Sequence, residues 1–381
     1  MHLTNLRLRH FRNHVDSSFQ FGSGTNLLLG DNGEGKTNVL EAISYLCLTK
    51  SFYASSDALA LGFGGEMFEV GGTFVSGGGS EHHIRVAYTR SPVVEKVVTV
   101  DRRHVEPFTS MIGRFPIVIS SPEYAAIIAG APMERRKFID LVISQSSSAY
   151  LQHLIDYRKV LRHRNRILKE ARIEGRDCSE LLVPWDEQLI GSGSALTHRR
   201  AKFVREFQEF VSSSYHHLVG SAEEPAIDYK PMIRISGGST EAEIGTMLEA
   251  NLEQMRSIEM RAGVTLIGPQ RDEIVFKING LDVRDYASQG QQKTFLIALK
   301  MAEFFYLKDR SGETPILLLD DIFSELDEHR AKELLHFVEG LSQTFITSTT
   351  PRFFENGAAM DDSHKRFLIR KGAVIEEGVP V

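Results

Sequence analysis

A single glycine-rich segment constrains the fold of this chain more than any other feature. It consists of Gly30, Asp31, Asn32, Gly33, Glu34, Gly35, Lys36 and Thr37, which match the pattern G-x-x-x-x-G-K-[ST] without a mismatch. The apolar residues 27–29 precede this segment, and a helical pattern over residues 36–48 follows it. A strand, a glycine-rich turn and a helix in this order predict an α/β fold with a phosphate-binding loop.

Each residue type in this loop suits a bound nucleoside triphosphate. Glycines lack Cβ atoms and let the backbone N–H groups approach the phosphates, and the start of the following helix adds a favourable dipole. Lys36 supplies a cation for the β- and γ-phosphates, and the hydroxyl group of Thr37 is placed to hold Mg²⁺. A turn that only caps a helix would need neither side chain. We therefore expect ATP or GTP, with Mg²⁺, at this loop.

A second strand carries the acidic residues that such a loop needs. Residues 316–319 are apolar and are followed by Asp320 and Asp321, which is typical of a buried parallel strand whose carboxyl end meets the nucleotide. We expect Asp320 to hold Mg²⁺. We expect Asp321 to orient or deprotonate the attacking water, and Lys36 to assist catalysis. Without a phosphate loop, two acids at this place could equally form a solvated turn.

Another polar segment lies shortly before the acidic strand and opens a helix at about residues 293–307. Its residues Ser288, Gln289, Gly290 and Gln291 resemble the signature motif of ABC-type ATPases, usually LSGGQ, although Ala287 and Gln289 depart from the commonest form. A serine hydroxyl, a glycine and a helix start together form an anion-binding surface. In that superfamily this surface faces the γ-phosphate bound to a second subunit. Ser324 and Asp327 resemble the D-loop of the same superfamily.

Composition and apolar patterning favour a protein without a membrane span. Of the 381 residues, 42% are hydrophobic and 25% are charged, as in ordinary globular proteins, and no apolar run approaches the length of a bilayer. The first residues alternate polar and apolar, which is typical of a strand and not of a signal peptide. Cys47 and Cys178 are the only cysteines and lack metal-ligand spacing. We therefore expect a reducing, cytoplasmic location and no membrane partner.

The order of the expected elements predicts a core built from both ends of the chain. Strand-like segments lie at residues 6–11, 25–29, 67–70 and 84–88, and again at 264–267, 274–278, 316–319 and 344–347. Helical patterns cover 133–176 (as two helices), 194–217, 241–259 and about 329–341, with a turn at Pro184. We expect a discontinuous α/β domain at residues 1–125 and 262–381, with a mainly helical lobe inserted at residues 126–261.

Segments along nearly the whole chain resemble the RecF family, which comprises ABC-type ATPases of bacterial recombinational repair related to Rad50 and SMC heads. The resemblance rests on residues 6–13, 30–42, 121–123, 134–140, 185–189 and 268–273, and on Asp320 and Asp321 in place of an Asp-Glu pair. It implies a Rad50-like P-loop ATPase head, an ATP-dependent homodimer on DNA and slow, DNA-stimulated hydrolysis. It also implies mediator proteins that help to load a recombinase at DNA gaps during repair, replication and the SOS response.

Three departures from the family pattern bear on the mechanism. Gln270 stands where His is usual, residues 50–52 are Lys-Ser-Phe in place of Arg-Ser-His, and no Gln or His occupies the expected Q-loop and switch positions. Thr349, after the strand at 344–347, is the candidate switch residue. A hydroxyl group senses the γ-phosphate less strongly than an imidazole does. The side chain of the candidate base, Asp321, is also shorter than that of a glutamate. We therefore expect slow turnover.

A cluster of cations in the helical lobe is the candidate DNA surface. Residues 151–176 hold eight Lys or Arg against three Asp or Glu, although the whole chain has a formal net charge of −6. Arg158, Arg162 and Arg166 are four residues apart and share one helix face, and Arg200 could lie alongside on the returning helix. Such a stripe would bind phosphates without sequence preference. A solvated helix face is the alternative interpretation.

Four functions stay open at this point. A RecF-like, ATP-gated switch on single-stranded, duplex or gapped DNA accounts for both the signature-like segment and the basic lobe. An SMC- or Rad50-like structural ATPase would need a longer heptad arm. A transport-type cassette would place Lys36 and Asp320 closer together in sequence, and a P-loop kinase would not need residues 288–291.

Overall fold

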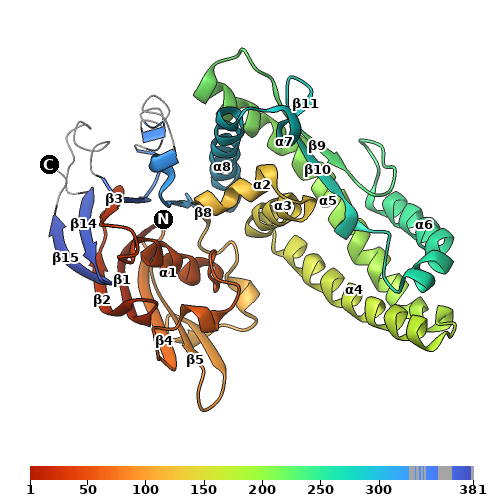
Figure 1. Cartoon of the computed structure of the whole chain (residues 1–381), viewed down its shortest axis with the longest axis horizontal. Coiled ribbons are helices and arrows are strands. Elements are labelled where there is room, and N and C mark those ends of the chain that lie inside the picture. The colour runs from red at the N-terminus through yellow and green to blue at the C-terminus, as the bar shows by residue number, and fades with distance from the viewer. Residues whose placement is uncertain (326–330, 332–333, 336–337, 339, 351–362, 379–381) are drawn as a thin grey trace. The chain divides into compact units, whose positions relative to one another are not determined.

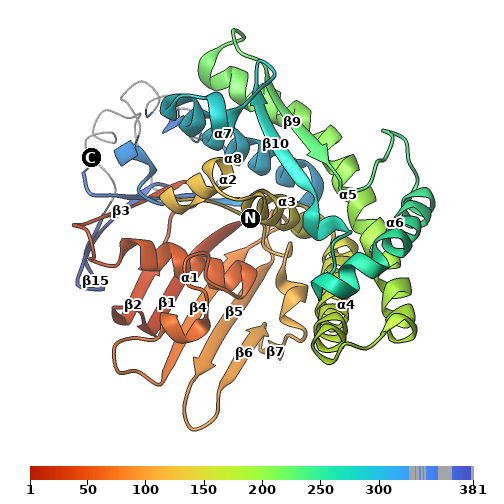
Figure 2. The same cartoon turned by 45° about the vertical axis from the view of Figure 1, so that its right-hand side comes forward.

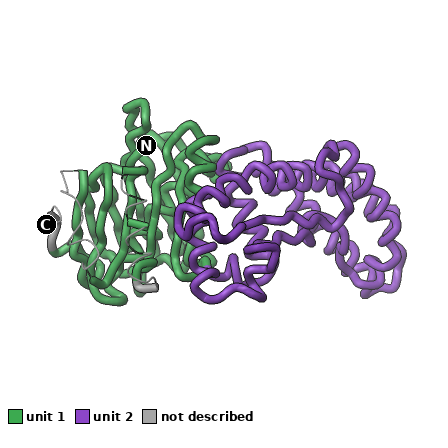
Figure 3. Tube along the Cα trace, turned by 90° about the horizontal axis from the view of Figure 1, so that it is seen from above, with its two compact units in different colours: residues 1–124, 303–381 green, residues 125–302 purple. Residues whose placement is uncertain are grey.

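The computed structural model describes residues 1–325, 331, 334, 335, 338, 340–350 and 363–378. They form two compact units, unit 1 with residues 1–124 and 303–381, and unit 2 with residues 125–302 (Figure 3). Unit 1 thus comes from both ends of the chain. The sequence places the second boundary at residue 262 instead. Residues 262–302 belong to unit 2 because their strand at residues 273–278 pairs with residues 225–230.

Unit 1 contains two six-stranded sheets (Figures 1 and 2). The antiparallel sheet has the order β2-β1-β4-β5-β6-β7, and the mixed sheet has the order β15-β14-β3-β13-β12-β8. The strands are β1 His2–Phe11, β2 His14–Gln20, β3 Thr25–Leu29, β4 Met67–Val75, β5 Glu81–Thr89, β6 Glu95–Val100, β7 Arg103–His104, β8 Ile117–Ser120, β12 Ile316–Leu319, β13 Thr344–Ser348, β14 Lys365–Arg370 and β15 Ala373–Gly378. The helices are α1 Lys36–Leu48 and the 3-10 turns η1 Asp57–Ala60, η2 Phe108–Met111, η3 Pro122–Tyr124 and η5 Ile322–Glu325.

Helix α1 packs against both sheets of unit 1. It contacts β1, β4 and β5 of the antiparallel sheet, which it crosses in Figure 2, and β13 of the mixed sheet. Its side chains are therefore buried on nearly every face, and most of the buried ones are apolar, as expected for an enclosed helix. Gly72 in β4 admits this close approach, because a Cβ atom there would lie 2.5 Å from Leu46 Cδ1 and 3.0 Å from Leu3 Cδ1.

The centre of the mixed sheet positions the predicted site. All five residues of β3 are buried, and β3 runs parallel to β13 on one side and to β14 on the other. Strand β12 runs parallel to both β13 and β8. The carboxyl ends of β3, β12 and β13 therefore meet at one sheet edge, and this brings the phosphate loop next to the acids that follow β12.

Unit 2 is mainly helical and carries one small sheet with the order β11-β10-β9. Its helices are α2 Ala125–Ala129, α3 Pro132–Ser146, α4 Ser148–Glu174, α5 Ser179–Val219, α6 Glu241–Ala262, η4 Pro269–Arg271, α7 Val283–Tyr286 and α8 Gln289–Ser311, which continues into unit 1. Its strands are β9 Pro225–Lys230, β10 Glu273–Ile278 and β11 Leu281–Asp282. The long helices α4, α5 and α6 pack on one another.

A buried ion-pair network ties these three helices together. Arg164 on α4 is fully buried, and its guanidinium reaches Asp186 on α5 (2.7 Å), Glu259 on α6 (2.6 Å) and the hydroxyl group of Thr265 (2.8 Å). Close helix packing accompanies it, because a Cβ atom on Gly193 of α5 would lie 3.2 Å from the ring of Tyr157. The network and this small contact residue fix the positions of the helices within unit 2.

Two sequence predictions for unit 2 are wrong. No turn occurs at Pro184, since α5 runs from 179 to 219 without a break. Pro184 is the sixth residue of α5, where its missing N–H group removes the bond to the carbonyl group of Glu180 without ending the helix. Residues 264–267 form no strand, because side chains satisfy their backbone: Leu266 N–H donates to Glu259 Oε1 (2.6 Å) and Thr265 N–H to Asn165 Oδ1 (2.8 Å). The helix expected near residues 329–341 lies largely outside the described residues.

Replacing Arg164 by Leu should destabilise unit 2 severely. Glu259, which is fully buried, would lose its cation, and an unpaired buried charge costs about 3–5 kcal/mol. The free energy of unfolding, measured in urea, should fall by this amount. Arg166→Leu on the same helix is the control, because the side chain of Arg166 is 77% exposed, and its effect should stay below about 0.5 kcal/mol. Equal effects of the two substitutions would contradict the role of the network.

Candidate nucleotide-binding site

The phosphate loop keeps a backbone path that glycine adopts more easily than any other residue. Gly30, Gly33 and Gly35 have φ values of +153°, +82° and +110°. A Cβ atom on Gly30 would lie 2.4 Å from the carbonyl oxygen of Ile369, and one on Gly35 would lie 2.9 Å from His14 Nε2. A Cβ atom on Gly33 would meet no atom within 4 Å. Space and φ together require glycine at 30 and 35, whereas φ alone favours it at 33.

Lys36 begins helix α1 and turns its side chain back over the loop. Its Nζ donates hydrogen bonds to the carbonyl oxygens of Gly30 (2.7 Å) and Asp31 (2.9 Å). Burial lowers the pKa of Lys36, and the carboxylates of Asp321 and Asp320 oppose this shift. The loop therefore holds a cation on its inner side, which suits the β- and γ-phosphates of a nucleotide.

Asp320 lies beside Thr37 at the end of β12. Thr37 Oγ1 and Thr347 Oγ1 each donate to Asp320 Oδ1, both at 2.8 Å, and only 6% of Asp320 is exposed. Burial raises the pKa of Asp320, while the two hydroxyl groups and Lys36 oppose the shift. A carboxylate next to a threonine hydroxyl offers the oxygen ligands that Mg²⁺ prefers. The donor set of Thr37 and Asp320 therefore fits a magnesium ion.

Further carboxylates gather at this sheet edge. Asp321 follows directly and has a φ of +47°, a left-handed conformation that Asp adopts more readily than most residues. Glu123, just after β8, is close enough that the charge of Asp320 adds to burial in raising the pKa of Glu123. Three acids near one another favour a divalent cation between them, because it would relieve their mutual repulsion.

Thr347 on β13 is a site residue that the sequence does not single out. Its hydroxyl group accepts a hydrogen bond from the N–H group of Asp321 (2.8 Å) and donates to Asp320, so it orients both acids. Thr349, the predicted switch residue, is exposed and is the first residue beyond the strand. The sequence does contain a signal, since a hydroxyl group inside a buried strand next to the acidic strand needs a hydrogen-bond partner.

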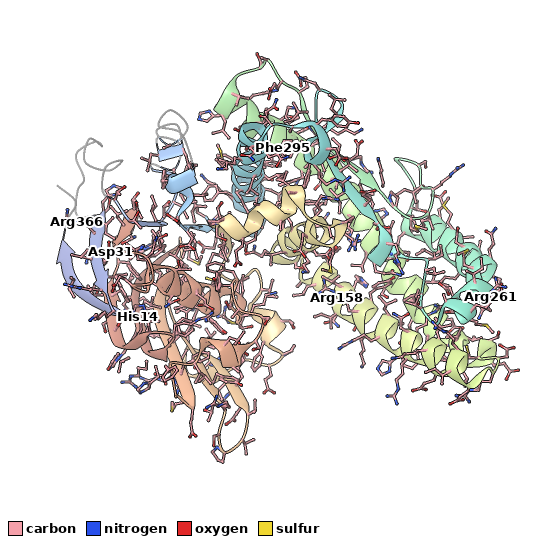
Figure 4. The ribbon with its side chains drawn as sticks, in the orientation of Figure 1. His14, Asp31, Arg158, Arg261, Phe295 and Arg366 are labelled. Carbon is pink, nitrogen blue, oxygen red and sulfur yellow. The ribbon has the colours of Figure 1, made fainter. Side chains whose placement is uncertain are left out.

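The turn between β1 and β2 braces the loop from one side. Asn13 Nδ2 donates to the carbonyl oxygen of Glu34 (3.1 Å), and His14 Nε2 lies 3.1 Å from the carbonyl oxygen of Gly35. His14 is fully buried, and burial lowers its pKa. Figure 4 labels His14 together with Asp31 of the loop.

Arg12 in the same turn is clamped to helix α1. Its guanidinium donates two hydrogen bonds of 2.8 Å to Glu41, which is 1% exposed. Ser51, in the Lys-Ser-Phe segment that departs from the family pattern, donates to the same carboxylate (2.5 Å). The departure therefore leaves the serine contact in place.

The turn between β14 and β15 braces the loop from the other side. Gly372 N–H donates to the carbonyl oxygen of Glu34 (2.9 Å), and the N–H group of Lys371 donates to the carboxylate of Glu34. The two turns also touch, since a Cβ atom on Gly372 would lie 2.1 Å from the carbonyl oxygen of Asn13. Two hairpin turns therefore hold the backbone of the loop from both sides.

The signature-like segment lies in unit 2 and opens helix α8 with a reciprocal cap. Gln291 N–H donates to Ser288 Oγ (3.2 Å), and Ser288 N–H donates to Gln291 Oε1 (2.9 Å). Gln291 Nε2 also donates to Glu223 Oε1 (2.8 Å). Ser288 and Gln289 are exposed, so the helix start can face another molecule. Of the predicted D-loop, Ser324 lies in η5, whereas Asp327 lies outside the described residues.

The structure separates the predicted DNA residues into two groups. Arg158, Arg162 and Arg166 are exposed on α4, as Figure 4 shows for Arg158. Arg158 lies 3.4 Å from Asp140, and Arg166 pairs with Glu170 at 2.8 Å. These three remain candidates for phosphate contact.

Arg200 does not belong to that surface. It is 3% exposed, and its guanidinium bonds to Asp140 (2.9 Å), Asp272 (3.2 Å) and the carbonyl oxygen of Pro269 (2.7 Å). Its prediction as a DNA contact is therefore wrong, because the side chain is enclosed in an ion-pair network. Gln270, which replaces the usual His, is likewise structural. The side-chain amide of Gln270 accepts a hydrogen bond from the hydroxyl group of Tyr157 and donates one to the carbonyl oxygen of Ile267.

Comparison with known proteins identifies the family. A family model described as an AAA domain matches residues 5–158. The DNA replication and repair protein RecF of Chloroherpeton thalassium is 42% identical over 357 residues, which cover 93% of this chain and 96% of the relative. The chain belongs to the RecF family. Among the functions that the sequence leaves open, this confirms the RecF-like ATPase of DNA replication and repair.

Solved structures agree with this assignment. A structure described as the recombination mediator protein RecF with ATP in the RecFOR pathway has 32% sequence identity and a TM-score of 0.90, and covers 99% of this chain and 97% of that chain. An SMC head bound to the C-terminal winged-helix domain of ScpA has 13% identity and a TM-score of 0.54, covering 100% of this chain and 97% of that one. The predicted ABC-type head with an inserted helical lobe is thus confirmed. Within the described part of the chain, no helix has the length and apolarity of a membrane span.

Removing the hydroxyl group of Thr347 should weaken binding of the magnesium–nucleotide complex. In Thr347→Val, the Asp320 carboxylate loses a hydrogen-bond donor, and the Asp321 N–H group loses its acceptor. The shape of side chain 347 is kept. We expect about a tenfold loss of affinity for Mg-ATP in isothermal titration calorimetry, the size of one hydrogen bond to a charged group. Thr347→Ser retains the hydroxyl group and should bind nearly as the parent chain does. A Val variant with unchanged affinity would exclude this role.

Proposed function

We propose that this chain binds ATP with Mg²⁺ and acts as an ATP-gated DNA-binding switch in replication and repair. The observation that carries the proposal is the cluster of Lys36, Thr37, Asp320 and Thr347 at one sheet edge of a RecF-family chain. The loop N–H groups and Lys36 bind the triphosphate, and Thr37 and Asp320 hold Mg²⁺, which neutralises phosphate charge when bound.

Hydrolysis in this proposal is slow and is stimulated by DNA. Asp321 orients or deprotonates the attacking water, and the hydroxyl group of Thr347 fixes the backbone of Asp321. Among the described residues, the hydroxyl groups of Thr37 and Thr347 donate to the carboxylate of Asp320, and neither partner is an imidazole. A site with a short carboxylate base and no imidazole partner should hydrolyse ATP slowly, which suits a regulatory switch better than a motor protein.

ATP joins two copies of the chain in this proposal. Residues 288–291 of one copy close over the triphosphate bound at Lys36 of the other, where the exposed start of α8 and the Ser288 hydroxyl group contact the γ-phosphate. The D-loop residues Ser324 and Asp327 line the same seam. The higher affinity of ATP for the dimer than for the monomer makes the nucleotide a switch.

A mixing experiment tests the shared site. Lys36→Met removes the loop cation, and Ser288→Arg blocks the signature surface, so neither variant alone should dimerise with ATP in light scattering or hydrolyse ATP. Mixed in equal amounts, the two should regain dimerisation and about half the turnover per heterodimer, because one of its two sites combines an intact loop with an intact signature segment. Full activity of either variant alone, or no recovery in the mixture, would count against a shared site.

DNA contacts in this proposal come from the exposed arginines of α4. The solved RecF structure is described as a recombination mediator of the RecFOR pathway. By analogy, this chain works with mediator proteins to support recombinase loading at gapped DNA and the SOS response. The α4 stripe contacts phosphates without sequence preference, which suits a protein that must find gaps anywhere in a genome.

Reversing the charge of the stripe tests the DNA surface. Arg158→Glu, Arg162→Glu and Arg166→Glu together should weaken binding to gapped duplex by more than about tenfold with ATP present. The slope of log affinity against log salt should fall by about 3, one for each lost phosphate contact. The matched control is Arg205→Glu, Lys230→Glu and Arg234→Glu, a triple reversal of exposed cations in the same unit, which should leave DNA affinity unchanged. The same loss in both triples would show a general charge effect and not a defined surface.

A further inference from the structure

Strand β9 is the outer strand of the small sheet in unit 2, and its free edge is only partly covered. Helix α5 runs beside it (Figures 1 and 2). Gln208 on α5 accepts a hydrogen bond from Ile227 N–H (2.8 Å) and donates to the carbonyl oxygen of Pro225 (2.9 Å). One side-chain amide thus fills the first pairing position of the edge, as a neighbouring strand would.

The next pairing position opens into a groove. Backbone groups alternate along a strand, so Tyr229 presents its N–H and C=O groups to the same edge as Ile227. Among the described residues, no side chain caps these two groups. The groove has a volume of about 600 Å³ and is walled by β9, by α5 at Ala201 and Arg205, and by residues 235–237. This volume lies within the range of natural binding pockets.

The lining of the groove combines an apolar floor with a positive rim. The floor contains Val204, Ile227 and Ile235, and the rim carries Arg205 and Lys230. Both cations are exposed, and neither has an acidic partner in the part of the chain that the structure describes. The one carboxylate of the lining, Asp228, is already paired with Lys277 at 2.5 Å. The groove therefore has uncompensated positive charge.

We propose that this groove binds a short, extended, acidic segment of another protein, which adds as a strand to β9. The backbone of the segment would pair with Tyr229, an apolar side chain would lie on the floor, and carboxylates would meet Arg205 and Lys230. Strand addition of this kind takes affinity from the backbone and specificity from alternate side chains. The proposal is independent of the nucleotide and DNA functions.

Two features define the occupant further. Pro225 begins β9 and Pro231 follows it, and proline cannot donate to a strand partner, so the paired stretch is short. Single-stranded nucleic acid would need an aromatic face for base stacking. Tyr229 is the only aromatic residue of the lining, and its hydroxyl group is bound to Asp272. The groove therefore favours a peptide over a nucleic acid.

The experiment measures peptide binding to the full chain by fluorescence anisotropy. The probe is a fluorescein-labelled, end-capped octapeptide of alternating glutamate and valine, and its counterpart has lysine in place of glutamate. Two further versions carry N-methyl groups on the amides of one edge or of the other. We expect the acidic peptide to bind, the lysine peptide to fail, and only one of the two methylated peptides to lose binding, because strand addition uses one edge.

Protein variants assign the binding to the groove. Arg205→Glu with Lys230→Glu should weaken the acidic peptide by at least about tenfold, and Ala201→Trp should do the same by filling the groove without a change of charge. Arg261→Glu, at the far end of α6 (Figure 4), and the α4 triple reversal are the controls and should bind as the parent chain does. Thermal unfolding followed by circular dichroism checks that each variant is folded.

Three outcomes would overturn the proposal. The first is unchanged peptide affinity in folded groove variants. The second is equal binding of both methylated peptides, which would mean that charge alone holds the segment. The third is displacement of the peptide by a 20-nucleotide single strand whose own affinity falls in the groove variants, which would make the groove a nucleic-acid site.

Discussion

The conformation of the phosphate loop is the constraint on which unit 1 depends. Backbone N–H groups of this loop can turn toward a phosphate along a path with positive φ values, and Gly30, Gly33 and Gly35 supply them. Such a path is not self-supporting. The turns at residues 11–14 and 370–373 hold it from both sides through bonds to Gly35 and Glu34. The edge strands β2 and β15 of the two sheets thus support the loop from both sides.

The parts of the site that the sequence predicts are those set by neighbours in the chain. A buried strand, a glycine loop and a helix start follow one another within residues 25–48, and the acids follow their own strand directly. Parallel pairing then brings Thr37 and Asp320 together, because adjacent parallel strands end at the same edge. Local sequence pattern and sheet geometry are sufficient to predict that Thr37 lies beside Asp320, without knowledge of any contact between distant residues.

What the sequence does not predict depends on contacts between distant residues. Thr347 acquires its role from a strand that pairs beside β12, and Arg200 is buried only because Asp140 and Asp272 approach it from α3 and from the residue after η4. Arg158 and Arg200 look alike in a helical pattern, yet one is exposed and the other enclosed. The strand prediction for residues 264–267 fails for the same reason, since the side chain of Glu259 satisfies backbone groups that local rules leave unpaired.

The bonds of Lys36 have a consequence for selectivity among anions. Its ammonium group is already satisfied by the carbonyl oxygens of Gly30 and Asp31, so an incoming ligand must exchange two good contacts for better ones. Chloride, which is a single spherical acceptor without oxygen atoms, gains little from that exchange. A polyphosphate chain can replace both contacts and reach the rest of the loop at once. The carbonyl contacts of Lys36 therefore disfavour chloride in addition to the repulsion that the neighbouring carboxylates of Asp320 and Asp321 exert on any anion.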